Sequence, residues 1–291
     1  EIDTYGIDKF NATCKEFVYQ NIEMDLGWTY LTKRMGYWVD MSTAYITCTT
    51  NYVESVWWAL KKFYDKGLIY RGFKVVPQSP TIATPLSSHE LSLGYKDVRD
   101  PNCFIKLKIT DSPINELIGA QLLVWTTTPW TLLANVATAV GVKYDYVLVR
   151  NVRKTKTEEL TDLLVLSKDR LSVLEGEYEI LKEFKGEEFV GTKYEQIFPY
   201  YKIDFEKYPQ ALNVLPGDFV TTGDGSGIVH LAPAFGEDNY AMSKKFKIPF
   251  AQPVTPHGHF TEDMGDIAVR ASNTFTYEDR TEEGADKDII I

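Results

Sequence analysis

Three adjacent threonines lie between two tryptophans in this sequence, and their hydroxyls are well suited to hold a polar ligand. Residues 125–135 read Trp-Thr-Thr-Thr-Pro-Trp-Thr-Leu-Leu-Ala-Asn. A hydroxyl both donates and accepts hydrogen bonds, so Thr126, Thr127 and Thr128 can bind a sugar or an aminoacyl group without a titratable side chain. The apolar run before them predicts a buried strand, and Pro129 predicts a turn. An edge strand that simply ends at a proline is the alternative interpretation.

A glycine-rich turn that leads into a short apolar strand is the second candidate ligand site. Residues 223–239 read Gly-Asp-Gly-Ser-Gly-Ile-Val-His-Leu-Ala-Pro-Ala-Phe-Gly-Glu-Asp-Asn, and His230 is the only histidine in either motif. A lone histidine on an apolar strand is more often a core residue than a ligand-binding one. The presence of the threonine-rich segment in the same chain favours a pocket wall instead.

Together the two motifs resemble the editing domain of the isoleucyl-tRNA synthetases, the insertion called the first connective polypeptide, of the eukaryotic cytosolic type. In the valine and leucine enzymes the threonine-rich segment reads Thr-Arg-Pro-Glu-Thr or Thr-Arg-Pro-Asp-Thr, whereas residues 128–130 match the isoleucine type. The similarity covers most of residues 30–255. Further segments resemble the flanking parts of that family: residues 34–40, 54–58, 65–72 and 84–90.

The resemblance implies a hydrolytic function. A pocket for isoleucine cannot strongly exclude valine, because one methylene is worth only ~1–3 kcal/mol, and the isoleucine enzymes are the standard example of this limit. A second site is therefore expected to accept valine attached to the 3′ end of tRNA(Ile), to reject isoleucine by size and to cleave the ester. Valyl-adenylate is a further substrate that such a role allows.

The resemblance also assigns roles to individual residues. Thr126, Thr127 and Thr128 are expected to contact the ester, the terminal adenosine or the attacking water, and His230 is expected to form the wall that limits side-chain size. Asp238 completes the predicted catalytic set. No residue stands out as a general base, so positioned water and the free ribose hydroxyl are expected to suffice. The predicted substrate-binding residues are Trp125, Thr131, Asn135, Ala232, Phe235 and Asn239, and the resemblance implies that Trp125 and Asn135 shape and fix the threonine loop.

The recognition of the substrate's α-ammonium is where this sequence departs from the family. A buried unpaired charge is expensive, so the ammonium needs a carboxylate. In most relatives an aspartate stands nine residues after the histidine, and here that position is Asn239, with Asp238 before it. Either Asp238 takes over, or Asn239 offers a neutral carbonyl, or Asp238 is only a solvated residue or helix N-cap.

Leu133 is a second departure, because it replaces a usual proline and should loosen the threonine loop. With Asn239 it motivates an alternative function from another class. In that alternative the chain is a degenerate module that binds a tRNA end or a partner without hydrolysis.

Cofactors and metals are expected elsewhere in the parent enzyme. No His-Ile-Gly-His motif or Lys-Met-Ser-Lys-Ser loop occurs, so we expect ATP and Mg²⁺ to act in a synthetic domain outside this chain. The three cysteines are widely spaced and no Cys-x-x-Cys or His-x-x-x-His pattern exists, which predicts no metal site. Residues 87–90 read Ser-Ser-His-Glu, but neighbours in sequence cannot form a hydrolase triad.

Composition limits the partners. A formal charge of -10 argues against broad nucleic-acid binding, but not against a single-stranded tRNA end that enters a pocket. The longest apolar runs are a few residues, and no leader segment is seen, so we expect a cytoplasmic protein without membrane contact. The remaining expected partner is the rest of the synthetase chain.

The predicted fold is α/β (α+β), a β-barrel-like editing domain with peripheral helices and mostly short strands. An amphipathic helix is predicted at residues 52–66, ended by Gly67, with its aromatic stripe in a core. Residues 151–162 are expected to form a charged surface loop running into a helix. The predicted divisions are a leading helical and β-ribbon part at 1–115, an editing core at 116–258 and a polar return segment at 259–291. Strands are predicted at 74–76, 104–109, 121–126, 146–149, 163–166 and 227–231.

Overall fold

The chain forms two compact units. A computed structural model describes residues 2–23, 27–97, 102–154 and 159–265. Contacts divide the chain into Glu1–Phe73 and Lys74–Ile291. No helix within the described ranges is both long and apolar enough to cross a membrane.

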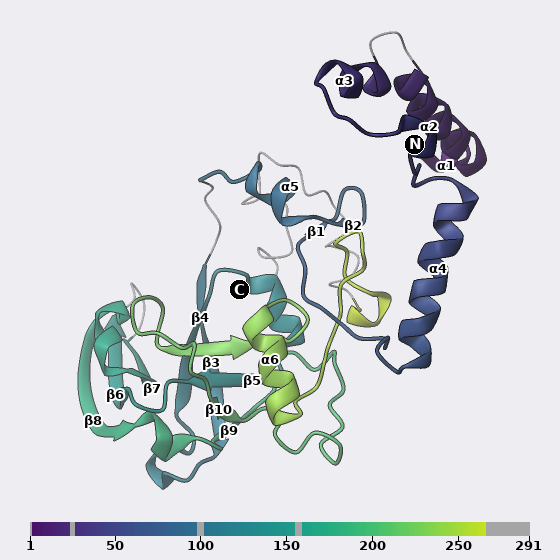
Figure 1. The fold of residues 1–291 in the computed structure, drawn as a ribbon. Helices are drawn as coiled ribbons and strands as arrows, with labels where there is room; N and C mark the ends of the chain where they lie inside the picture. The colour runs from purple at the N-terminus through teal and green to yellow at the C-terminus, as the bar shows by residue number, and fades with distance from the viewer. Residues whose placement is uncertain (1, 24–26, 98–101, 155–158, 266–291) are drawn as a thin grey trace. The chain divides into compact units, whose positions relative to one another are not determined.

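The first unit is helical (Figure 1). Its second-longest helix is α4. This helix begins after Thr49 and is followed, after Lys66, by Gly67 at φ 69°. Only glycine adopts this left-handed conformation without strain, so the predicted helix and its stop are confirmed. Residues 9–23 and 28–33, which lack a clear period, also form helices. The elements are α1 (Ile2–Tyr5), α2 (Ile7–Glu23), α3 (Trp28–Arg34), η1 (Met41–Thr43) and α4 (Thr50–Asp65).

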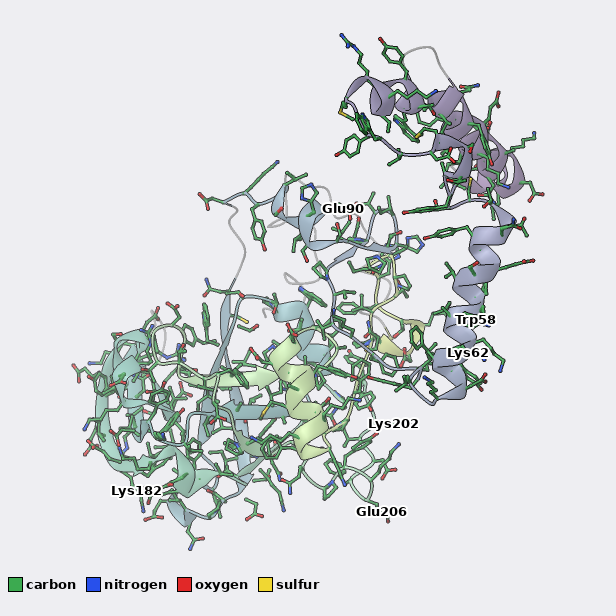
Figure 2. All side chains as sticks on the ribbon, in the orientation of Figure 1. Trp58, Lys62, Glu90, Lys182, Lys202 and Glu206 are labelled. Carbon is green, nitrogen blue, oxygen red and sulfur yellow. The ribbon has the colours of Figure 1, made fainter. Side chains whose placement is uncertain are left out.

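The aromatic stripe of α4 is exposed. Trp57 and Tyr64 are each 67% exposed, and none of the helix's residues is buried. Lys62 places its Nζ 5.6 Å from the centre of the Trp58 ring, as the two labelled side chains in Figure 2 show. The prediction that this stripe packs into a core is therefore wrong for the part of the chain that the structure describes.

The second unit is built on two sheets. The larger has the strand order β8-β6-β7-β4-β3-β9 and curls into a half barrel, and the smaller has the order β10-β5-β11. β4 and β7 are parallel, whereas β3–β4 and β6–β7 are antiparallel. The strands are β3 (Cys103–Asp111), β4 (Gln121–Thr126), β5 (Ala137–Val140), β6 (Asp145–Lys154), β7 (Glu159–Ser167), β8 (Glu177–Lys185), β9 (Lys193–Tyr194), β10 (Val214–Pro216) and β11 (Ile228–Leu231).

Short elements complete this unit. A small antiparallel hairpin, β1 (Gln78–Ser79) with β2 (Thr84–Pro85), replaces the strand predicted at 74–76. The 3-10 helices are η2 (Asn115–Leu117), η3 (Pro129–Ala134), η4 (Lys168–Val173), η5 (Gly186–Phe189) and η6 (Glu262–Met264), and the α-helices are α5 (Ser88–Ser92) and α6 (Glu237–Phe246). The mixed, barrel-like fold with mostly short strands is confirmed.

The core lies between the two sheets. One cluster joins Leu107, Leu122 and Val165 of the large sheet to Val140 and Ile228 of the small one, and all are at most 1% exposed. A second cluster packs α6 against the other face of the small sheet through Met242 and Leu231. Burial of this apolar surface stabilises both sheets and fixes where their ends meet.

Two segment predictions need comment. Residues 151–162 are not a loop leading into a helix: their described part belongs to the β6–β7 hairpin, in which Asn151 pairs with Asp162. Asp162 bonds Lys106 at 2.6 Å and Arg153 at 3.1 Å, so the charges pair across strands. The large sheet also includes β3, which lies before residue 116, where the editing core was predicted to begin. Phe260 and Met264 are buried beside Leu133, while residues 266–291 lie outside the described residues.

A buried tyrosine joins the two sheets. The Tyr146 hydroxyl on β6 donates to the Gly227 carbonyl at 2.7 Å and accepts from the Gly141 N–H at 3.1 Å. Tyr146 is fully buried, and burial raises the pKa of its phenol far above the usual range. The hydroxyl therefore stays protonated and keeps both bonds.

We expect Tyr146→Phe to destabilise the chain by about 1–3 kcal/mol, because it leaves a buried N–H and a buried carbonyl without a partner. Urea unfolding followed by circular dichroism measures the change. Tyr178→Phe is the matched control, since Tyr178 is 46% exposed on β8. Equal stability of the two variants would show that the Tyr146 bonds contribute nothing.

Candidate functional site

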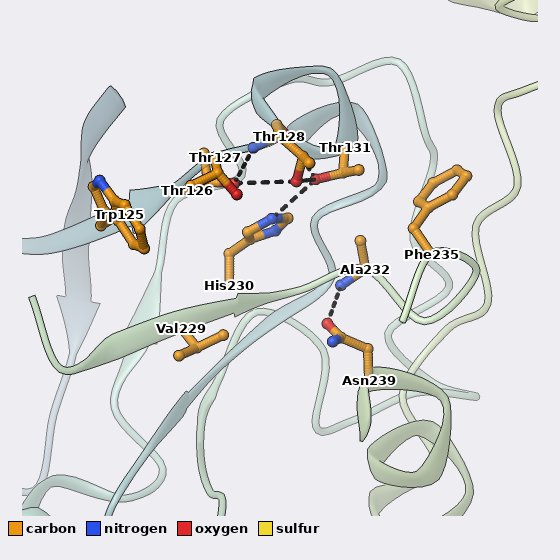
Figure 3. Close-up of a pocket in the computed structure, with 10 residues that line it drawn as sticks. All are labelled: Trp125, Thr126, Thr127, Thr128, Thr131, Val229, His230, Ala232, Phe235 and Asn239. Carbon is orange, nitrogen blue, oxygen red and sulfur yellow. Dashed lines mark hydrogen bonds between the residues drawn. The ribbon is translucent and has the colours of Figure 1, made fainter. Parts of the chain in front are cut away.

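The two motifs meet at one pocket in the second unit (Figure 3). Its cavity volume is about 260 Å³, which suits an aminoacyl group and part of a sugar rather than a large ligand. All but one of the pocket residues were predicted as site residues from the sequence, the exception being Val229. The lining consists of Trp125, Thr126, Thr127, Thr128, Thr131, Val229, His230, Ala232, Phe235 and Asn239.

The threonines at the end of β4 have different roles. Thr126 is buried, and its Oγ1 accepts a hydrogen bond from the Thr128 backbone N–H at 3.1 Å. It therefore fixes the turn into Pro129, which opens η3 without needing a backbone donor. Thr127 and Thr128 are exposed at the pocket. These two residues carry the hydroxyls that a ligand can reach.

Thr131 connects the threonine segment to the histidine. Its Oγ1 donates to the Thr128 carbonyl at 2.8 Å and lies 3.0 Å from His230 Nε2. A hydroxyl has one hydrogen, so toward the imidazole it must accept. His230 Nε2 therefore carries the ring proton, and Nδ1 is a bare acceptor.

His230 is held neutral by burial. The side chain is 8% exposed, and its Nδ1 has no hydrogen-bond partner among the described residues. Desolvation lowers the pKa of His230 to about 4, because burial penalises the charged imidazolium. At neutral pH the pocket wall is thus an uncharged ring fixed in one tautomer.

The strand and the turn before it set the position of His230. On β11, His230 pairs with Thr138 of β5. A Cβ at Gly225, which has φ 63°, would lie 2.7 Å from Trp125 Cε3. The glycine turn therefore packs directly against Trp125 because it lacks a side chain.

Arg170 is a positioning residue that the sequence analysis missed. Its Nε donates to the Gly225 carbonyl at 2.8 Å, and its Nη1 donates to the Gly223 carbonyl at 2.9 Å. Arg170 lies in η4, far from either motif in sequence, and no local pattern connects it with the glycines. Val229 was also missed as a lining residue. It directly precedes His230 on β11, and this neighbouring position was the available signal.

Asn135 fixes the loop from within the core rather than lining the pocket. It is 3% exposed, its Nδ2 donates to the Ala137 carbonyl at 3.1 Å, and its Oδ1 accepts from the Tyr194 hydroxyl at 2.8 Å. Both ends of the amide are therefore occupied. Asn135 is thus not part of the lining, and it holds the threonine segment from behind, in the loop-fixing role that the resemblance implies.

In α6, Asp238 and Asn239 at the end of the second motif point in different directions. Asn239 lines the pocket, and its Oδ1 accepts from the Ala232 N–H at 2.9 Å. Asp238 is exposed in the first turn of the helix and is not part of the lining. Consecutive helical residues point about 100° apart, so only one of the two can face the pocket. The structure therefore favours Asn239 over Asp238 as the residue that faces the bound ligand.

Aromatic packing closes the far side of the pocket. The rings of Trp130 and Phe235 meet edge to face, with centroids 4.8 Å apart. Such pairs hold large side chains in one orientation. Phe235 and Ala232 thus give the pocket an apolar wall opposite the hydroxyls.

The serine of residues 87–90 is a helix cap. Ser87 is the N-cap of α5: its Oγ accepts from the Glu90 N–H at 3.2 Å, and the Glu90 carboxylate accepts from the Ser87 N–H at 2.9 Å. Glu90 is labelled in Figure 2. This capping box explains the sequence without catalysis. Within the described ranges no three His, Cys, Asp or Glu side chains gather as metal ligands would.

Comparison with known proteins places the chain among the synthetases. Residues 1–256 match the profile of the tRNA synthetases class I (I, L, M and V). The isoleucine–tRNA ligase of Clostridium acetobutylicum is 44% identical over 264 residues, which are 91% of this chain and 24% of that protein. The isoleucine–tRNA ligase of Chlamydia caviae is 39% identical over 266 residues, with 90% and 24% covered. The chain thus spans about a quarter of these curated relatives.

Solved structures of editing domains are also similar. The editing domain of the P. knowlesi cytosolic leucyl-tRNA synthetase covers 53% of this chain and 65% of its own, with TM-score 0.40 and 18% identity. The corresponding P. falciparum domain covers 43% of this chain and 47% of its own, with TM-score 0.35 and 22% identity. The family rests on the sequence match: the chain belongs to the class I tRNA synthetases of the I, L, M and V group.

Proposed function

We propose that the second unit is the editing site of an isoleucine–tRNA ligase, which hydrolyses the ester between valine and the 3′ end of tRNA(Ile). The observation that carries this proposal is a single pocket lined by exposed Thr127 and Thr128, by a buried histidine and by the apolar side chains of Ala232 and Phe235. The ligase family of its relatives supports the substrate class. Valyl-adenylate, with the same acyl group, is a second substrate of this site.

The proposed reaction needs positioning more than acid–base chemistry. Water attacks the ester carbonyl carbon, the bond from that carbon to the ribose oxygen breaks, and the water proton ends on the ribose hydroxyl. Thr127 and Thr128 hold the water and the developing oxyanion by hydrogen bonds. Burial lowers the pKa of His230 to about 4, its Nδ1 is buried and its Nε2 is bonded to Thr131, so His230 acts as a wall and not as a base.

Selection by size follows from the apolar side of the pocket. Val229, Phe235 and the His230 ring surround the space for the substrate side chain. Valine fits, and the extra methylene of isoleucine meets the fixed imidazole. The reaction uses water alone, so ATP and Mg²⁺ belong to the synthetic half of the parent enzyme, in the cytoplasm.

The first unit is proposed to pack against the rest of a synthetase chain. Its α4 carries exposed aromatic residues such as Trp57 and Trp58, each about two-thirds exposed. Apolar surface of this extent marks an interaction site. The matched relatives are about four times as long as this chain. The additional part of such a synthetase would supply the partner surface.

We expect Thr127→Val with Thr128→Val to lower hydrolysis of valyl-tRNA(Ile) by about 10²-fold, the usual loss when hydrogen bonds to an oxyanion are removed. Release of labelled valine under single-turnover conditions measures the rate. Thr138→Val is the control, since the buried Thr138 hydroxyl has no partner in the described structure. An unchanged rate in a folded double variant would assign the threonines to structure alone, whereas no hydrolysis by the wild-type chain would favour the non-catalytic alternative.

We expect His230→Ala to open the pocket wall, so that isoleucyl-tRNA(Ile) becomes a substrate while valyl-tRNA(Ile) remains one. The removed ring leaves room for the extra methylene. Parallel deacylation assays with the two esters measure the selectivity. If isoleucyl-tRNA(Ile) resists the variant as well as it resists the wild-type chain, His230 does not select by size.

Acid should destabilise the chain through His230. The folded pKa of about 4 lies below the unfolded value near 6.5, so the unfolded state binds more protons between these pH values. The free energy of unfolding is therefore highest above pH 6.5 and falls by up to about 3 kcal/mol toward pH 4.

His230→Asn should remove that part of the pH dependence, whatever it does to stability at neutral pH. Urea titrations at several pH values between 4 and 7 measure it. His89→Asn, a change at an exposed histidine, is the control. Parallel curves for wild type and His230→Asn would contradict a depressed pKa.

A further inference from the structure

The orientation of the Asn239 amide is fixed by its partner. A backbone N–H can only donate, so the atom that faces Ala232 N at 2.9 Å must be the amide oxygen. The other end of the amide is its nitrogen, which Figure 3 draws without a hydrogen bond to any other residue shown there. It lies where a Cβ at Gly236 would approach it to 2.7 Å, so glycine at that position leaves room for the amide.

Asn239 therefore offers a neutral N–H donor in place of a carboxylate, and the acceptors of the lining are all uncharged. None of the ten lining residues is Asp, Glu, Lys or Arg. The titratable groups around Asn239 are the buried His230 on β11 and, beside it on α6, the carboxylates of Glu237 and Asp238. Both carboxylates are exposed and outside the lining. Nothing in the lining compensates a positive charge.

We infer that Asn239 makes this site selective for acyl groups whose α-substituent is uncharged, an α-hydroxyl or a free-base α-amine, over those that carry an α-ammonium. The inference rests on the proposed ester-hydrolysing function and deepens it. A hydroxyl or a neutral amine accepts a hydrogen bond from the Asn239 N–H. An ammonium has no lone pair, so it meets a like-signed dipole and loses its hydration.

The same geometry predicts the effect of an aspartate at position 239. One carboxylate oxygen would keep the bond from Ala232 N–H, and the other would stand where the amide nitrogen now stands. The change exchanges a neutral donor for a charged acceptor while the shape stays the same. Charge-assisted hydrogen bonds are roughly twice as strong as neutral ones, so the preference should reverse.

The test compares two non-hydrolysable ligands that differ only at the α-position: 3′-amide-linked valyl-adenosine and 2-hydroxyisovaleryl-adenosine. Calorimetry gives the Kd of each for the full chain at pH 6.5 and pH 9. Since α-amino groups have pKa values of about 7.7–8.0, the valyl compound changes from charged to neutral over this range. The hydroxy compound does not titrate and serves as the internal reference.

At pH 6.5 we expect the hydroxy compound to bind about tenfold or more tightly than the valyl compound, and the ratio to shrink at pH 9. Asn239→Asp should reverse the ratio at pH 6.5. Glu237→Gln is the matched control, because it removes an exposed carboxylate one position before Asp238 and should leave the ratio unchanged. Tighter binding of the valyl compound to the wild-type chain at pH 6.5 would overturn the inference.

Two further outcomes identify what has failed. If Asp238→Asn raises the preference for the hydroxy compound, Asp238 reaches the ammonium and the assignment to Asn239 is overturned. Hydrolysis of valyl-tRNA(Ile) is measured separately: no hydrolysis with the expected binding ratio rejects the proposed function alone, and hydrolysis with a valyl preference rejects the inference alone. Binding of neither compound to a folded chain rejects both.

Discussion

The hydrogen bond between Thr131 Oγ1 and His230 Nε2 is the interaction on which the pocket depends. It joins two segments 99 residues apart, and both of its ends are determined by other contacts. The Thr131 proton is committed to the Thr128 carbonyl, and the imidazole is buried in its neutral form. A charged or rotated ring would break the bond, so the wall and the threonine turn keep one geometry together.

That bond is useful only because the two sheets are held at a fixed separation behind it. Gly227 stands at φ 77°, and a Cβ there would come within 2.5 Å of the Ser167 Cβ. Tyr146 holds the carbonyl of the same glycine from the other sheet. Arg170 and Trp125 then restrain the turn before it. The rigidity of the site thus comes from close backbone contacts that glycine alone permits, rather than from ion pairs.

The sequence predicted the parts of this arrangement that depend on local pattern. Apolar runs marked most of the strands, and Gly67 marked the end of α4, because both signals lie within a few residues. The outer part of the β6–β7 hairpin was missed because its charges resemble those of a loop. In the fold, Asp162 is paired with Arg153 of the neighbouring strand and with Lys106 of β3, which is distant in sequence. Arg170 was missed for the same reason, because its partners Gly223 and Gly225 are more than 50 residues away in sequence. The choice between Asp238 and Asn239 needed the phase of α6, which begins only at Glu237.

Once these contacts are combined, the pocket is polar without being charged. Its lining offers hydroxyls, one amide and one neutral imidazole, and a low-dielectric site of this kind disfavours any ion that has no partner. The proposed ester cleavage would turn a neutral acyl carbon into a carboxylate, which would find no cation among the lining residues. The same lack of charge that limits recognition of an ammonium therefore weakens the hold on the acid that is formed. A hydrolytic site gains from this asymmetry, because the ester is bound by shape and hydrogen bonds while its ionised product is released to water.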